Sequence, residues 1–109
     1  MIDFWASWCG PCRQEMPNFI KVYHEYKSKG FEVVGVSLDE NKEAWVGAIK
    51  KLGIPWAQMS DLKGWQCAGA AAYNVKSIPA TILIGQDGKI IAKDLRGEEL
   101  ETKLKEILR

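Results

Sequence analysis

One stretch decides the fold of this 109-residue chain: IDFWASWCGPCR, residues 2–13. Residues 1–7 form a short apolar run of strand length, and a long pattern of helical spacing follows it. Two cysteines separated by two residues, Cys9 and Cys12, lie at the junction of these patterns. That position favours a reversible disulfide at a helix N-terminus. The stretch therefore predicts a strand, a turn and a helix that together carry a redox dithiol.

The composition fits one domain, residues 1–109, because 47% hydrophobic residues can fill a single core. Lys and Arg number 15 against 14 Asp and Glu, a formal net charge of +1, so no global field attracts nucleic acid or an anionic membrane. No apolar run reaches the roughly 18 to 20 residues of a membrane span. Three cysteines leave one pair and one remainder, which is typical of a catalytic dithiol rather than a disulfide scaffold.

A helix is predicted to follow the dithiol directly. Helical spacing begins at about Gly10, and Pro11 suits the first turn because its missing N–H would have no intrahelical partner there. Pro17 is expected to kink the helix after that turn, and Gly30 ends the pattern. Residues 31–38 are β-branched and nearly all apolar, which predicts a strand covered on both faces of a parallel sheet.

The middle of the chain predicts a second helix and two shorter elements. Either Asn41 or Asp39 can cap a helix that ends at Gly53. Residues 54–59 suit a short edge strand, and residues 62–73 have the pattern of an alanine-rich helix.

The last third of the chain predicts a hairpin and a final helix. Asp87-Gly88 lies between the apolar runs 80–84 and 89–92, a strong hairpin signal. Residues 98–109 form an amphipathic pattern with acidic residues first and basic residues last, which suits the helix dipole. The order of elements implies an α/β fold: a mixed sheet with helices on both faces, its first part parallel and its last part an antiparallel hairpin.

The run from Phe4 to Cys12 resembles the active-site signature of thioredoxin-like proteins, specifically the bacterial thiol-disulfide oxidoreductases around TlpA and ResA. The resemblance continues more loosely to the C-terminus, and residues 39–74 are similar to the central insertion of TlpA-like proteins. It implies a thioredoxin-like fold in the bacterial cell envelope or periplasm, although the cytoplasm stays open. Family members carry further strands, and often a signal peptide or lipid anchor, ahead of this point, so the chain resembles a trimmed domain.

The same resemblance implies the partners: protein or peptide disulfides as substrates, and an upstream electron donor or acceptor. A monomer is expected, with no cofactor beyond the dithiol and no metal.

The two cysteines are expected to have different roles. Cys9 lies just ahead of the helix, where unpaired N–H groups and the dipole stabilise the thiolate that attacks disulfides. Cys12 lies inside the first turn and is more enclosed, which makes it the resolving thiol. Gly10-Pro11 matches the dipeptide of reducing thioredoxins and favours reduction, although the reverse direction is chemically allowed.

Two acids are candidates for the proton acceptor of Cys12. Asp3 lies inside an apolar run, so partial burial should raise its pKa, and its position matches the buried acid of thioredoxin. An exposed residue at a frayed chain start is the alternative. Glu40 follows the strand 31–38, where ResA-like proteins are expected to place an active-site glutamate; a solvated carboxylate at a helix start fits equally well.

A substrate-contacting set is predicted around the dithiol. Ile78-Pro79 falls where thioredoxin-like proteins keep a cis-proline, and a cis bond there leaves the Ile78 backbone free to pair with an extended substrate. A trans-proline opening a strand is the alternative. Trp8, with Gly10 and Pro11, is expected to supply an apolar rim for the substrate. The other tryptophans are predicted to pack in the core: Trp5, Trp45, Trp56 and Trp65.

Several alternatives remain open. Half of a zinc site could use His24 and Cys67, although zinc sites usually pair two close-spaced ligand sets. Haem attachment is excluded, because Arg13 rather than histidine follows Cys12. Cys67 alone is expected to be a small buried hydrophobe, with a regulatory or second resolving thiol as the alternative. The competing functions are a thioredoxin-fold peroxidase and a non-enzymatic partner-binding module.

Overall fold

The computed structural model describes residues 1–108, and within them one sheet holds five strands in the order β3-β2-β1-β4-β5. The central strand β1 (Ile2–Trp5) pairs in parallel with β2 (Val34–Ser37) and antiparallel with β4 (Ala80–Ile84). Outside them, β3 (Ala57–Met59) pairs in parallel with β2, and β5 (Ile90–Lys93) pairs antiparallel with β4. The predicted mixed sheet is therefore confirmed.

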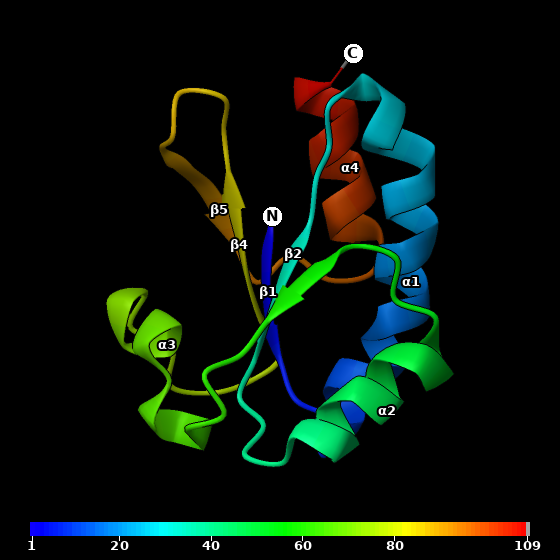
Figure 1. Ribbon diagram of the computed structural model, residues 1–109. Coiled ribbons are helices and arrows are strands. Elements are labelled where there is room, and N and C mark those ends of the chain that lie inside the picture. Colours follow the sequence, from blue (N-terminus) through cyan, green and yellow to red (C-terminus); the bar gives the residue numbers. More distant parts are fainter. Residues whose placement is uncertain (109) are drawn as a thin grey trace.

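Helices cover both faces of this sheet (Figure 1). On one side lie α1 (Gly10–Tyr26), α2 (Lys42–Leu52) and α4 (Glu98–Ile107), and on the other side lies the short α3 (Ala68–Ala72). The structure confirms the predicted α/β class and the predicted order of elements. In the part of the chain that the structure describes, no helix is both long and apolar enough to cross a membrane.

The first helix starts where the sequence predicts. Cys9 is its N-cap in an extended conformation, and Pro11 lies in its first turn. The helix continues through Pro17 to Tyr26, and a kink at Pro17 stays a prediction. A short 3-10 turn follows, and Gly30 ends it with φ of 103°, a left-handed conformation that costs glycine little.

The core surrounds β1, which is buried because helices cover both of its faces. Phe4, Trp5 and Ala6 have no exposed surface. The stripe that α1 turns toward the sheet has five buried members: Cys12, Met16, Phe19, Val22 and Tyr26. Leu100 and Leu104 of α4 complete the layer. Burying each large apolar side chain contributes about 1.5–3 kcal/mol, so the strand that leads to the dithiol is firmly held.

The start of α2 decides between two predicted caps. Asn41 is the cap, because its side chain accepts a hydrogen bond from the N–H of Ala44 at 3.0 Å. Asp39 is buried and makes other bonds, described below. At the far end Gly53 adopts a left-handed conformation, as its position predicts.

The prediction of one helix over residues 62–73 is wrong in its first half. Leu62 and Gly64 have positive φ angles, 59° and 58°, which an α-helix cannot include. The chain makes a 3-10 turn over Gly64–Gln66 instead. The α-helix starts only at Ala68, whose N–H donates to the Asp61 carboxylate at 3.0 Å.

Candidate redox site

The dithiol lies where β1 gives way to α1. Cys9 and Cys12 are joined by a disulfide, with their Cα atoms 5.3 Å apart. Both residues are nearly enclosed, 5% exposed for Cys9 and 2% for Cys12. The N–H of Cys12 donates to Cys9 Sγ at 3.2 Å. Such a donor at the positive end of a helix stabilises a thiolate on Cys9, which supports the predicted division of roles.

Three of the predicted substrate-contacting residues, Trp8, Gly10 and Pro11, flank Cys9 in the sequence and are exposed; we call them the collar. Trp8 is 56% exposed, and Gly10 and Pro11 are exposed at the first turn of α1. Cys9 itself is almost enclosed, so these three residues are the exposed part of the chain on either side of it.

The loop that carries Trp8 is held by Asp39, a buried carboxylate just beyond the end of β2. The N–H of Ser7 donates to both of its oxygens, at 3.2 and 3.1 Å, and the Ser7 hydroxyl donates to Oδ1. The Ser37 hydroxyl donates to Oδ2. Ser7 lies two residues before Cys9, so Asp39 fixes the approach of the chain to the dithiol. The sequence pattern around Asp39 suggests only a helix cap and does not indicate this role.

Asp3 is buried in the middle of the sheet and lacks a full set of hydrogen bonds. It is 1% exposed, so the alternative of a frayed, exposed residue is wrong. Its Oδ2 atom has no hydrogen-bond partner among the described residues. Burial raises the pKa of Asp3 to about 7, and the negative charge of Glu15 adds to the rise. A carboxyl group with this pKa can hold or release a proton near neutral pH.

Glu15 links the helix of the dithiol to the segment before α4. Its Oε1 accepts from the N–H of Gly97 at 2.7 Å and from the Asn18 side chain at 3.1 Å. Asn18 also donates to the carbonyl of Gly97 at 3.3 Å. This role of Glu15 could not be predicted from the sequence, because its partner lies 82 residues away and no local pattern marks the contact.

The Ile78-Pro79 peptide bond is cis, as predicted. Ala80, the first residue of β4, pairs with Phe4 near the end of β1, so the proline lies at the end of β1 that leads to the dithiol. Arg96 donates to the carbonyl of Pro79 at 2.9 Å and ties this loop to the segment before α4. Pro79 is buried and Ile78 is half-buried.

Glu40 is exposed and lines a hollow of about 380 Å³. The hollow lies beside residues 6–9, which connect β1 to α1 and are called the dithiol loop below. Trp8 and Trp65 line the same hollow. The prediction that Trp65 packs in the core is wrong, because its side chain is 50% exposed. Trp65 follows the left-handed Gly64 in a 3-10 turn, so it does not lie on the core face of an α-helix. The prediction of core packing is confirmed for Trp5 and Trp56, which are buried, whereas Trp45 is only half-buried.

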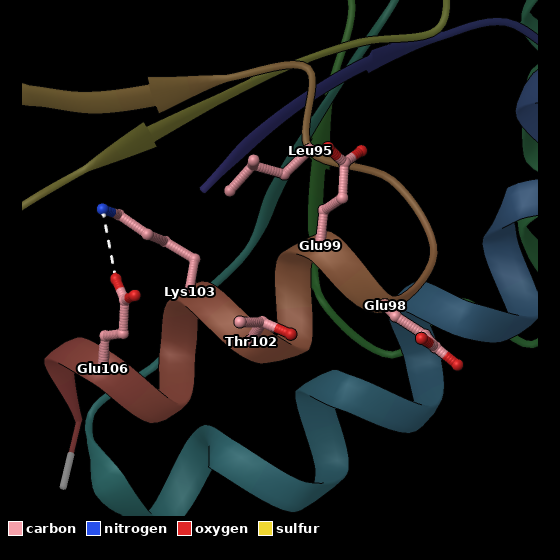
Figure 2. Close-up of a pocket in the computed structure, with 6 residues that line it drawn as sticks. All are labelled: Leu95, Glu98, Glu99, Thr102, Lys103 and Glu106. Carbon is pink, nitrogen blue, oxygen red and sulfur yellow. Dashed lines mark ion pairs between the residues drawn. The ribbon is translucent and has the colours of Figure 1, made fainter.

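A second hollow lies along α4, and Figure 2 shows side chains that line it. Glu98, Glu99 and Glu106 line it together with Lys103, which pairs with Glu106 at 3.5 Å. These are solvated helix-face residues, and none of the side chains drawn is a nucleophilic thiol. The hollow therefore does not belong to the redox site.

The residues of the zinc alternative are not brought together. Within residues 1–108, no three His, Cys, Asp or Glu side chains cluster so as to hold a metal ion. The ring of His24 lies beside that of Tyr23 near the end of α1, with centroids 5.6 Å apart and the planes tilted by 56°. Cys67 is a buried free thiol at the N-terminus of α3. It lines an apolar hollow between that helix and the sheet.

Comparison with known proteins identifies the family of the chain and supports the fold described above. The family model described as Redoxin matches residues 1–108. The chain is 33% identical over 108 residues to the thiol-disulfide oxidoreductase ResA of Bacillus thuringiensis subsp. konkukian. That match covers 99% of this chain but 60% of the relative, so the chain spans less than two thirds of its length.

Solved structures are similar over nearly the whole chain. A thiol-disulfide oxidoreductase from Bacteroides fragilis has a TM-score of 0.91 at 42% identity, covering 98% of this chain and 79% of that one. The thioredoxin domain of a thiol-disulfide oxidoreductase from Bacteroides vulgatus has a TM-score of 0.91 at 35% identity, covering 99% and 77%. Both carry the fold described above.

Proposed function

The chain belongs to the Redoxin family and has a TlpA/ResA-like thioredoxin fold, and from this premise we propose that it reduces disulfides of proteins or peptides. One observation carries the proposal: Cys9 caps the N-terminus of α1 and forms a disulfide with Cys12 inside the first turn. This arrangement stabilises a thiolate on the outer sulfur and keeps a second sulfur within bonding reach.

The cycle begins with both cysteines reduced. The Cys9 thiolate attacks one sulfur of the substrate disulfide; a mixed disulfide forms, and the other substrate sulfur leaves as a thiolate that takes a proton. The Cys12 thiolate then attacks Cys9 Sγ, which breaks the mixed disulfide and releases the second substrate thiolate. The substrate gains two electrons and two protons, and the chain is left with the Cys9–Cys12 disulfide. An upstream dithiol donor must reduce this bond before the next turnover.

The resolving step needs a base, because Cys12 is a thiol until its proton is removed. Asp3 is our candidate: it is buried, one of its oxygens has no hydrogen-bond partner within residues 1–108, and its pKa is near 7. Glu40 is the weaker candidate, because it is exposed and lies beyond the end of β2. Asp3 would hold the proton during the attack and then release it.

The substrate would dock on the collar of Trp8, Gly10 and Pro11 and beside the cis Ile78-Pro79 loop. The exposed side chain of Trp8 and the position of the Ile78-Pro79 loop at the end of β1 that leads to the dithiol support this docking mode, in which an extended substrate pairs with the backbone of Ile78. We propose a monomer acting in the bacterial cell envelope, as the resemblance to TlpA- and ResA-like proteins implies.

Reduction of insulin tests the proposal. The wild-type chain with a dithiol donor should reduce it, and Cys9→Ser should lose the activity to the background of the donor alone. Cys67→Ser is the matched control and should keep the activity, because that buried thiol lies at the N-terminus of α3 and outside the dithiol. A wild-type chain that is inert with insulin and other protein disulfides would favour a partner-binding module instead. Activity that survives Cys9→Ser would contradict the mechanism.

A further inference from the structure

We propose that the hollow between Trp8 and Trp65 binds a basic side chain of the substrate, an arginine or lysine close to the disulfide that is reduced. The proposal rests on the proposed function, since it names a substrate class for that same site. It concerns a surface of about 380 Å³ formed by the dithiol loop, the start of α2 and the turn before α3.

Two exposed tryptophans mark this surface. Trp8 is 56% exposed and Trp65 is 50% exposed, and both line the one hollow although they come from distant parts of the chain. Exposed large aromatic side chains that gather at one place are typical of binding surfaces. Aromatic rings also offer a flat face on which a planar or cationic group can lie.

The hollow is continuous with the redox site. Trp8 is the residue before Cys9, and Ser7 and Asp39, which hold the loop in place, also line the hollow. Residues along an extended chain are about 3.3 Å apart. A substrate whose sulfur is bonded to Cys9 would therefore place a side chain from a neighbouring position over Trp8.

The charge of the lining selects the kind of side chain. Among the described residues that line the hollow, the charged ones are Asp39 and Glu40, both acidic. Asp39 is already bonded, whereas Glu40 forms no ion pair within residues 1–108. The neighbouring lysines, Lys42 and Lys63, do not line the hollow.

Glu40 lies against Gly64 at the hollow. A Cβ atom built on Gly64 would lie 2.5 Å from Glu40 Oε1, so the carboxylate approaches the backbone closely there. Gly64 also has a left-handed φ of 58°, a conformation that favours glycine. Two tryptophan side chains and the Glu40 carboxylate in one hollow favour a guanidinium or ammonium group, which gains from both the rings and the charge.

Three disulfide-bonded peptides test the proposal. They are identical except for the residue next to the reacting cysteine, which is arginine, leucine or glutamate. For the wild-type chain, we expect kcat/KM to be about fivefold higher for the arginine peptide than for the leucine peptide, and lowest for the glutamate peptide. The preference should weaken as salt is added, because the carboxylate is exposed.

Two variants test whether residues of the hollow cause the preference for the arginine peptide. Glu40→Gln should bring the arginine and leucine peptides to within about twofold of each other, and Trp65→Ala should reduce the preference as well. Glu43→Gln is the matched control, a carboxylate in the first turn of α2 that does not line the hollow, and it should keep the full preference.

Equal kcat/KM for the three peptides, a preference for leucine, or an arginine preference that survives Glu40→Gln would overturn this proposal and leave the reductase intact. A wild-type chain that reduces none of the peptides would contradict the proposed function, and this proposal with it.

Discussion

Two buried carboxylates, one on β1 and one just beyond β2, differ in their hydrogen bonds. Asp3 on β1 and Asp39 beyond β2 are each 1% exposed. Asp39 accepts bonds from the backbone and hydroxyl of Ser7 and from the hydroxyl of Ser37. Asp3 has an oxygen with no partner among the described residues, and its pKa is raised to about 7. Burial alone therefore does not give an acid its role. The donors around it decide whether it fastens a loop or exchanges a proton.

The largest effect should come from Asp3→Asn, measured as the free energy of unfolding against pH. In the folded chain the pKa is about 7, above the ordinary 3.8, so the folded state binds more protons between these values. Wild-type stability should therefore fall as pH rises from about 4 to about 7, by up to about 4 kcal/mol at 1.36 kcal/mol per unit. The variant lacks this group, so it should not show the fall and should be the more stable chain at pH 8.

Parallel curves for wild type and Asp3→Asn across pH 4 to 8 would contradict the raised pKa. Urea titrations at each pH give the free energies, and equal m-values would show that the denatured states are comparable.

Asp39→Ala should lower the free energy of unfolding, whereas Asp3→Asn should raise it at pH 8, and the change should be somewhat smaller. It leaves the Ser7 and Ser37 donors without their acceptor, which should destabilise the chain by about 3 kcal/mol in a urea titration at pH 7. Asp39→Asn keeps one acceptor oxygen and should lose less. If Asp39→Ala were as stable as wild type, the carboxylate would not hold the dithiol loop.

Asp3→Asn should also slow the resolving step. Loss of a general base costs about a hundredfold at the lower end of the usual range, so release of substrate from the mixed disulfide should slow by about that factor at pH 8. Rapid-quench trapping measures this step. The inflection near pH 7 should disappear from its pH profile, and an unchanged rate and profile would leave Asp3 without a part in the chemistry.

Ser7→Ala should show the smallest effect of the set. It removes the hydroxyl bond to Asp39 but keeps the backbone N–H bonds, so a loss of about 1 kcal/mol is expected. A loss as large as that of Asp39→Ala would mean that the hydroxyl, rather than the backbone, carries the link.

The sequence predicts well those features that depend on neighbouring residues. The start of α1 at Gly10 follows from the cap and the proline beside it. The cis bond before Pro79 could be predicted because a resemblance to a family marked its place. Burial of Asp3 follows from the apolar run around it.

Features that depend on distant contacts could not be predicted. Ser7 and Asp39 are 32 residues apart, and their bonds form only when the end of β2 meets the dithiol loop. Glu15 meets Gly97 for a similar reason. Trp65 is exposed because the chain takes left-handed turns at Leu62 and Gly64, where the composition favours a continuous helix.

The account depends above all on Cys9 as the attacking sulfur, and trapping with a disulfide-bonded peptide tests it most directly. Each variant that lacks one cysteine of the dithiol is reduced and mixed with the peptide, and the adduct and its site are measured by mass spectrometry. Cys12→Ala should accumulate a stable mixed disulfide through Cys9, whereas Cys9→Ala should form it far more slowly, because it is Cys9 Sγ that caps α1 and accepts the N–H bond that stabilises a thiolate. Equal or faster trapping through Cys12 in the Cys9→Ala variant would contradict the assignment.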